Sequence, residues 1–529
     1  MLPSLDPSEK IDLKPVAMLQ KRAIRLVTQC TPHIGLQTPE NLIFELDNPG
    51  RTGVDVAPFE RNFSRKLGKY ERTKPIGIPS LSEPQVVRHF YRLSRMNYCI
   101  DTGFYPLGSC TMKYNPRLNE AVARLPRLAN SHPLAPIDTV QGSIEIYHEL
   151  GSALLKLTGM DSICLSPAAG AHGELCGMLT IARAHEMLGN KKKRYVLIPD
   201  SAHGTNPSSS AMAGLKVRVV KSKSDGTVDL EDLKSKLTDD VAAMMLTNPN
   251  CAGLFEKDVL EISRILHEKG AFLYMDGANY NSFMGRAMVK DLGVDVMHIN
   301  LHKTFSTPHG SSGPGSGPVV FAESLTKYIP TPFIAKKKDG TFEIIESDKT
   351  RNSVGRMKAF YGQTGIIIRA LAYIYAMSNG LAVAAGDSVI NANYLKRRLM
   401  EEGVMPSFPE GHCMHEVLFD DSIVKGTGVS TMDVAKSLLD AGYHPPTVYF
   451  PLLVHGALLI EPTESEGIET IDEFVKTLAD LVKAAKSGKC LPTFQDAPQA
   501  TPIKRADDIG AAKNPILTYA QLRKKGLKN

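Results

Sequence analysis

The sequence predicts an α/β fold with a mostly parallel sheet, and two features of the chain point to it. Between residues 132 and 330, short apolar runs alternate with segments of helical periodicity. These runs are apolar throughout, which is typical of parallel strands that are covered by helices on both faces. The sequence contains no internal repeat.

Two helices and five strands are expected in this part of the chain. Apolar residues at helical spacing mark one helix over 175–182, which ends near Gly189. A second helix covers 259–266 and ends at Gly270. The expected strands are 195–199, 241–246, 271–275, 294–301 and 318–321.

A smaller α/β unit is predicted after residue 380. Its expected elements are helices at 389–399 and 434–441, strands at 416–419 and 457–460, and a last helix that starts with the capping box Thr470–Glu473. Residues 101–116 hold two Gly and two Pro, which indicates an ordered loop. We therefore divide the chain into an irregular N-terminal extension (1–131), a large domain (132–379), a small C-terminal α/β domain (380–490) and an extended basic tail (491–529).

Composition and charge exclude several classes of protein. The 529 residues are 43% hydrophobic and 22% charged, as in ordinary globular proteins. A net charge of +6 is small for a protein that coats nucleic acid, and most of it lies in 504–529, with seven Lys or Arg and two Asp. The apolar stretch 365–376 contains Arg369 and is too short to cross a bilayer. Eight cysteines without a CxxC pair, and an N-terminus without a signal-peptide pattern, predict a soluble cytoplasmic protein.

Chemically useful side chains follow two consecutive predicted strands. Lys303 follows 294–301 and is either a surface lysine at a strand exit or an imine-forming nucleophile. Asp276 follows 271–275 and is a loop acid, a magnesium ligand beside a nucleotide, or the partner of a pyridinium nitrogen. The sequence has no GxxxxGK[ST] loop for a nucleotide. Because ligands bind at the carboxyl ends of parallel strands, both side chains are expected to reach one flat ring.

Three further segments fit such a site. The small residues of 166–174 precede a helix and either offer N–H groups to a phosphate or form an ordinary turn. His203, on a loop at a strand end, either stacks on an aromatic cofactor or is an ordinary loop histidine. The glycine-rich segment 310–318 leads into a strand and does not fit GxGxxG, which favours a close-approach loop beside the lysine.

Metal and thiol chemistry are not expected. His298 and His302 would share one face of a strand without converging on an ion, and His412 and His415 lack a nearby carboxylate pattern. No sequence feature supplies a base for Cys110, so a loop thiol is favoured there.

Four long motifs carry a resemblance to a known family. They are YPLGSCTMKYNP at 105–116, SAHGTNP at 201–207, MDGAN at 275–279 and NLHKTF at 300–305. With shorter matches over most of 80–485, they resemble the glycine cleavage system P-protein family, glycine dehydrogenase (decarboxylating). The length is similar to that of the separate C-terminal-half subunit of its two-subunit form.

The resemblance implies a fold-type-I pyridoxal 5′-phosphate enzyme and a set of site residues. Lys303 would bind the cofactor covalently and Asp276 would pair with its pyridine nitrogen. Asn279 would contact the ring hydroxyl and His203 would stack on the ring. The phosphate would be held by Ala169, Gly170 and Ala171, with Asn300 and His302.

The resemblance also implies the reaction and the partners. Glycine would be decarboxylated, and its aminomethyl group would pass to the lipoyl arm of the H-protein, in an α2β2 assembly with a sister subunit. Arg351, Arg356 and the loop 101–116 are candidates for binding the glycine carboxylate. Two alternatives stay open: another fold-type-I enzyme for a small amino acid, such as a hydroxymethyltransferase, and a non-catalytic partner subunit, against which Lys303 and Asp276 argue.

Two places depart from the family pattern. The loop after the lysine usually reads HGGGGPG, whereas this chain has HGSSGPG with Ser311 and Ser312. These serines would be strained if the backbone there needs a positive φ, or would add a hydrogen bond. His455 stands where the family has an acidic residue.

Overall fold

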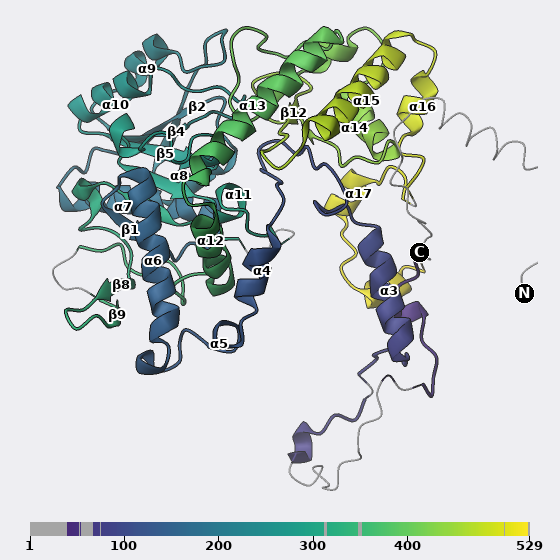
Figure 1. Cartoon of the computed structure of the whole chain (residues 1–529), viewed down its shortest axis with the longest axis horizontal. Coiled ribbons are helices and arrows are strands. Elements are labelled where there is room, and N and C mark those ends of the chain that lie inside the picture. Colours follow the sequence, from purple (N-terminus) through teal and green to yellow (C-terminus); the bar gives the residue numbers. More distant parts are fainter. Residues whose placement is uncertain are drawn as a thin grey trace, which may run out of the picture.

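A seven-stranded sheet lies at the centre of the larger part of the molecule (Figure 1). The computed structural model describes residues 40–51, 53, 67–74, 76–310, 315–347, 352–501 and 503–526. The sheet order is β1-β7-β6-β5-β4-β2-β3, and the neighbours from β6 to β3 are parallel, whereas β7 is antiparallel to both β6 and β1. The strands are β1 Ser162–Cys164, β2 Tyr195–Pro199, β3 Lys216–Val220, β4 Val241–Thr247, β5 Phe272–Gly277, β6 Val296–Ile299 and β7 Val319–Phe321.

Helices cover both faces of this sheet, as the wholly apolar strands predict. Met244 of β4 packs in one core cluster with residues of α6 (Gln141–Thr158), α10 (Val259–Glu268) and α12 (Thr364–Met377). Its neighbour Met245 packs in another cluster with residues of α7 (Gly170–Met187). Successive side chains of a strand point to opposite faces, so both faces of β4 are buried.

The second unit is a three-stranded antiparallel sheet in the order β10-β12-β11. Its strands are β10 Val417–Phe419, β11 Thr447–Val448 and β12 Leu458–Ile460, and its helices are α13 Gly380–Glu401, α14 Thr431–Asp440 and α15 Ile468–Lys486. Figure 1 shows α13 running from the large sheet towards this unit. The predicted boundary at 379/380 falls in the break between α12 and α13, and the division into domains stays a prediction.

The remaining elements are short and lie around the two sheets. α8 Thr205–Met212 and α9 Leu230–Lys236 join strands of the large sheet, and β8 Phe333–Lys336 and β9 Phe342–Ile345 form a separate hairpin. α11 Leu301–Thr304 is a single turn directly after β6.

Several predicted boundaries are wrong for local physical reasons. The strand expected over 294–301 ends at Ile299, because Asn300 is the N-cap of α11. α7 begins at Gly170, five residues before the predicted apolar start, since its first turn consists of small and polar residues. α15 is capped by Gly467, so the capping box expected at Thr470 does not exist. β3 is not among the predicted strands, because Lys216 and Arg218 alternate with its valines and leave no continuous apolar run.

The N-terminal extension is less irregular than predicted. It contains α3 (Glu83–Arg95), whose N-cap Ser82 forms a capping box with Gln85, followed by α4 (Arg117–Ala123) and α5 (Pro126–Ala129). α3 lies apart from the large sheet in Figure 1. The loop 101–116 has neither helix nor strand, as expected.

The prediction of an extended C-terminal tail is also wrong. The tail forms α16 (Leu491–Asp496), α17 (Asp508–Lys513) and α18 (Tyr519–Lys524). Phe494 is buried in the core of the second unit, and Arg505 pairs with Asp433 of α14 at 2.6 Å. Tyr519 stacks on Phe44, with ring centroids 4.9 Å apart. These contacts fold the basic tail back onto the rest of the chain.

Among the described residues, no single helix is both long and apolar enough to cross a membrane. α12 and α13 are together long and apolar enough to do so, but the chain bends by 93° at the break between them.

The buried position of Phe494 gives a stability prediction. Phe494→Ala leaves a cavity in the core of the second unit and should lower the free energy of unfolding by about 3 to 5 kcal/mol. The control is Leu517→Ala, because Leu517 is 78% exposed and its loss should cost less than about 0.5 kcal/mol. Urea unfolding measures both. Equal midpoints for the two variants would show that α16 does not pack as described.

Candidate active site

Asp276 and Lys303 come from two neighbouring parallel strands of the large sheet. Asp276 is near the end of β5, and it lies opposite His298 of β6 in the strand register. Lys303 is on α11, the helical turn that follows β6. Its Nζ donates a hydrogen bond to the backbone oxygen of Ser109 at 2.8 Å. The sheet therefore presents an acid and a lysine at one edge, as the strand order predicts.

The carboxyl group of Asp276 is buried and hydrogen-bonded. It accepts hydrogen bonds from Asn206 Nδ2 at 3.0 Å and from the Ala278 backbone at 2.9 Å, and Nε2 of His298 lies 3.3 Å away. Burial alone would raise the pKa of Asp276, but the charge of His298 and these hydrogen bonds outweigh it and lower the pKa below its ordinary value. Asp276 is therefore held as a carboxylate.

The N-terminus of α7 lies against the segments on either side of Lys303. Ala169 is the N-cap, so the N–H groups of Gly170 and Ala171 are in the first turn and have no acceptor within the helix. A Cβ on Gly170 would lie 2.7 Å from Asn300 Oδ1, and one on Gly315 would lie 2.8 Å from His302 Nδ1. The first approach places Asn300 against the start of α7, and the second places His302 beside Gly315, whose added Cβ would also lie 3.5 Å from the Ala168 oxygen.

Several buried polar atoms near this helix terminus lack hydrogen-bond partners among the residues that the structure describes. They are Ser166 Oγ, Asn300 Oδ1 and Ser316 Oγ. A buried polar atom without a partner is costly, so such atoms are expected where a ligand supplies the missing bond.

His203 follows β2, two strands away from β5, and Asn279 follows β5. His203 is exposed on the loop between β2 and α8, with Nδ1 2.7 Å from Thr205 Oγ1 and its ring 5.2 Å from that of Phe450. Thr205 in turn donates to the buried Glu174 at 2.7 Å. Asn279 is buried and donates to the Pro249 oxygen at 2.9 Å, while its Oδ1 has no partner within the described part of the chain.

Two buried acids from the second unit hold the loop over Lys303, and sequence reasoning missed them. Oε2 of Glu416 accepts the Ser109 N–H at 2.7 Å, and Oε2 of Glu461 accepts the Thr111 N–H at 2.9 Å. Both loop residues have positive φ, 66° and 49°. The sequence carried a partial signal, because Glu416 is the first residue of the predicted strand 416–419 and Glu461 directly follows the predicted strand 457–460.

The electrostatics of this pair follow from burial. Burial raises the pKa of Glu461 to about 7 and that of Glu416 well above its ordinary range, and Lys303 opposes both shifts. Burial and the charge of Lys303 lower the pKa of His415 to about 3. Nε2 of His415 lies 3.8 Å from Glu416 Oε1 and 4.0 Å from Glu461 Oε1.

Other predicted candidates lie elsewhere. Arg356 pairs with Glu346 near the surface, and Arg351, Ser311 and Ser312 are outside the described residues. Of the three candidates for binding the glycine carboxylate, the loop 101–116 is therefore the one that contacts Lys303 in the described part of the chain. His455 is exposed and pairs with Asp421. Burial raises the pKa of Cys110, which agrees with a loop thiol rather than a nucleophile.

The raised pKa of Glu461 predicts how stability depends on pH. Since the native state keeps a proton on Glu461 that the unfolded state releases above about 4.5, stability should fall as pH rises from 4.5 towards 7. Glu461→Gln removes this contribution, so the urea concentration at which half of this variant is unfolded should fall less steeply as pH rises from 4.5 to 7. Glu469→Gln, at the exposed start of α15, should keep the wild-type slope. Equal slopes for wild type and Glu461→Gln would contradict the description of Glu461.

Family models match two parts of the chain. The model described as "Glycine dehydrogenase, C-terminal domain" matches residues 384–494, and the aminotransferase class-V model matches residues 176–312. These matches cover the second unit and most of the parallel strands with α11.

Solved structures agree on the fold. A glycine decarboxylase (P-protein) of the glycine cleavage system, in inhibitor-bound form, matches with a TM-score of 0.66 at 18% identity, covering 79% of this chain and 94% of that one. A NifS-like protein matches with a TM-score of 0.57 at 17% identity, covering 72% and 100%. The fold-type-I fold that the sequence predicts is confirmed.

Relatives named probable glycine dehydrogenase (decarboxylating) subunit 2 match nearly the whole chain. The protein of Caulobacter vibrioides is 53% identical, covering 92% of this chain and 93% of the relative. That of Pseudothermotoga lettingae is 49% identical (90% and 99%), and that of Listeria monocytogenes serotype 4b is 46% identical (92% and 99%). At this identity and coverage, the chain belongs to the family of glycine dehydrogenase (decarboxylating) subunit 2.

Proposed function

We propose that this chain is the pyridoxal 5′-phosphate-binding subunit of a glycine dehydrogenase. It decarboxylates glycine and transfers the aminomethyl group to the lipoyl arm of an H-protein. The observation that carries the proposal is the meeting of Asp276 and Lys303 at the ends of β5 and β6, beside the N-terminus of α7. The names of its relatives support the choice of glycine as substrate.

The residues present fit pyridoxal phosphate by their chemistry. The N–H groups of Gly170 and Ala171, which have no acceptor within the helix, would with Asn300 and His302 offer a phosphate group donors at a helix N-terminus, which it favours. The hydroxyl groups of Ser166 and Ser316, which have no partner among the residues that the structure describes, lie in the same region and can donate hydrogen bonds to a phosphate. In this assignment Ala169 contributes as the N-cap that starts the helix.

The remaining assignments concern the ring. The carboxylate of Asp276 would hold a proton on the pyridine nitrogen, which its low pKa and its hydrogen bonds from Asn206 and Ala278 favour. His203 would stack on the ring, and Asn279 would contact the ring hydroxyl. When bound, this cofactor supplies an electron sink for the electron pair left by a departing carboxylate.

Lys303 and the loop above it supply the other groups. The Lys303 amine would leave the Ser109 oxygen to bind the cofactor, and Nζ would be free to move protons only after the amine of glycine has displaced it. The turn 108–111 contacts Lys303 through the Ser109 oxygen. Glu461, with a pKa of about 7, can hold or release a proton near neutral pH; its Oε2 accepts the Thr111 N–H and its Oε1 accepts from Asn281 Nδ2 at 3.4 Å.

The proposal extends to partners and compartment. The relatives are named subunit 2, which supports a sister subunit for this chain. We propose that the two form an α2β2 assembly in the cytoplasm, with the lipoylated H-protein as acceptor.

Replacement of Lys303 tests the proposed role most simply. In the assembly reconstituted with sister subunit and lipoylated H-protein, Lys303→Ala should reduce exchange of the glycine carboxyl with labelled bicarbonate about a thousandfold or more. Lys290→Ala, which removes only a surface ion pair with Asp161, should exchange at the wild-type rate. Undiminished exchange by Lys303→Ala would exclude the assignment. A wild-type assembly that lacks exchange but transfers hydroxymethyl groups would favour the alternative enzyme.

The need for a sister subunit gives a second prediction. The purified chain alone, loaded with cofactor, should show little glycine–bicarbonate exchange, and addition of the sister subunit should restore it. Full exchange by the isolated chain would contradict a shared active site.

A further inference from the structure

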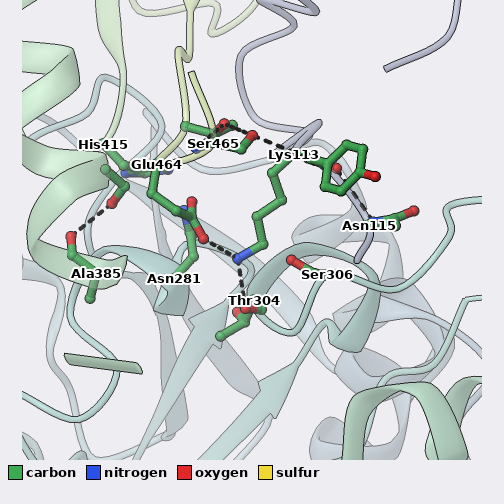
Figure 2. Close-up of polar contacts among 12 residues, drawn as sticks. Lys113, Asn115, Asn281, Thr304, Ser306, Ala385, His415, Glu464 and Ser465 are labelled. Carbon is green, nitrogen blue, oxygen red and sulfur yellow. Dashed lines mark hydrogen bonds and ion pairs between the residues drawn. The ribbon is translucent and has the colours of Figure 1, made fainter. Parts of the chain in front are cut away.

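Lys113, on the loop 101–116, has an unusual setting for a lysine. Its side chain is 1% exposed, and its Nζ donates to Glu464 Oε1 at 2.6 Å and to the Thr304 backbone oxygen at 2.9 Å. The same ammonium lies 5.3 Å from the centre of the Tyr373 ring. Figure 2 shows Lys113 reaching between Glu464 and Thr304. Burial opposes the charged form, but Glu464 and Tyr373 outweigh it and raise the pKa of Lys113, so the group is a cation.

The acceptor on α11 belongs to the residue after Lys303. A helix of one turn leaves its last carbonyl groups without partners inside the helix, and a cation at that end is favourable. Lys113 supplies this cation to Thr304. It thereby fixes the end of the turn that carries Lys303.

Two hydrogen bonds join the loop and α11, one donated by each segment. Lys303 of α11 donates to Ser109 of the loop, and Lys113 of the loop donates to Thr304 of α11. If Lys303 engages a cofactor, its bond to Ser109 is lost, whereas the bond from Lys113 can persist. Lys113 also reaches Glu464, in the segment that follows β12 of the second unit. One side chain therefore links the loop, the reactive turn and the second unit.

We propose that Lys113 is a positioning residue for Lys303, acting through the Thr304 carbonyl and anchored by Glu464. The inference rests on the proposed function in one respect, that Lys303 is the reactive lysine. Lys113 holds α11 in place when the Lys303 amine moves away from Ser109. Without it, the Lys303 amine should be held less firmly against the loop and be more accessible to small reagents.

Another buried lysine provides a matched control. Lys396 of α13 is 4% exposed, and its Nζ donates to the backbone oxygens of Phe408 at 2.9 Å and Gly411 at 3.0 Å. Both acceptors lie in the second unit, away from α11. Lys396→Met, like Lys113→Met, removes a buried lysine that donates two hydrogen bonds. Both acceptors of Lys396 are backbone carbonyls, whereas Lys113 donates to one carbonyl and one carboxylate. Neither bond of Lys396 reaches the turn that carries Lys303.

The test measures the reactivity of Lys303 in the cofactor-free protein. Lys113→Met, Lys113→Arg, Glu464→Gln and Lys396→Met are treated with formaldehyde and cyanoborohydride, and peptide mass spectrometry follows methylation of Lys303 and of surface Lys290 over pH 7 to 9. Loss of the charge-assisted bond should raise the Lys303 rate about tenfold in Lys113→Met. Lys113→Arg, which keeps the cation, should recover part of the wild-type rate, and Lys396→Met should leave it unchanged.

Each outcome decides for or against the inference. A wild-type Lys303 rate in Lys113→Met, or an equal rise in Lys396→Met, overturns it, since the effect would then be absent or general. If Lys113→Met does not fold, Glu464→Gln carries the test and must raise the Lys303 rate relative to Lys396→Met. In the reconstituted assembly, Lys113→Met should lower kcat more than it raises KM for glycine. Methylation of Lys303 does not depend on any reaction of glycine. The methylation rates therefore test the role of Lys113 even if the proposed function is wrong.

Discussion

The register between β5 and β6 is the constraint on which the site depends. It sets Asp276 opposite His298 and ends both strands at the same edge of the sheet, so that α11 starts beside the acid. A shift of one residue would turn Asp276 to the other face, because successive side chains of a strand alternate. The wholly buried strands on both faces fix this register, since Met275 and Tyr274 must each enter a different core cluster.

The second unit completes the site from the opposite side. Glu416 and Glu461, at the ends of β10 and β12, hold the strained turn at Ser109 and Thr111, and Glu464 receives Lys113. Buried acids and a buried lysine are costly unless they are paired and hydrogen-bonded. Their presence in one small region, all directed at the segment around Lys303, is better explained by function than by stability.

The parts of the fold that local pattern determines could be predicted from the sequence. The apolar runs at 195–199 and 241–246 are β2 and β4, and the strand order brings Asp276 and Lys303 together. The residues set by long-range packing could not be predicted. The sequence places Glu416 and Glu461 at the ends of predicted strands, but their burial and their bonds to the loop arise from tertiary contacts. Lys113 gains its partner 351 positions along the chain. The short helices of the tail have little apolar periodicity, so its sequence predicts an extended segment. Phe494 nevertheless packs in the core of the second unit.

The central claim is that Lys303 carries the cofactor, and borohydride reduction of the loaded protein tests it most directly. Reduction fixes the cofactor to its lysine, and peptide mapping then identifies the modified residue. The account predicts a pyridoxyl group on the peptide that contains Lys303, and an absorbance band that glycine alters before reduction and not after it. A modified Lys113 or any other lysine, with Lys303 unmodified, would contradict the account.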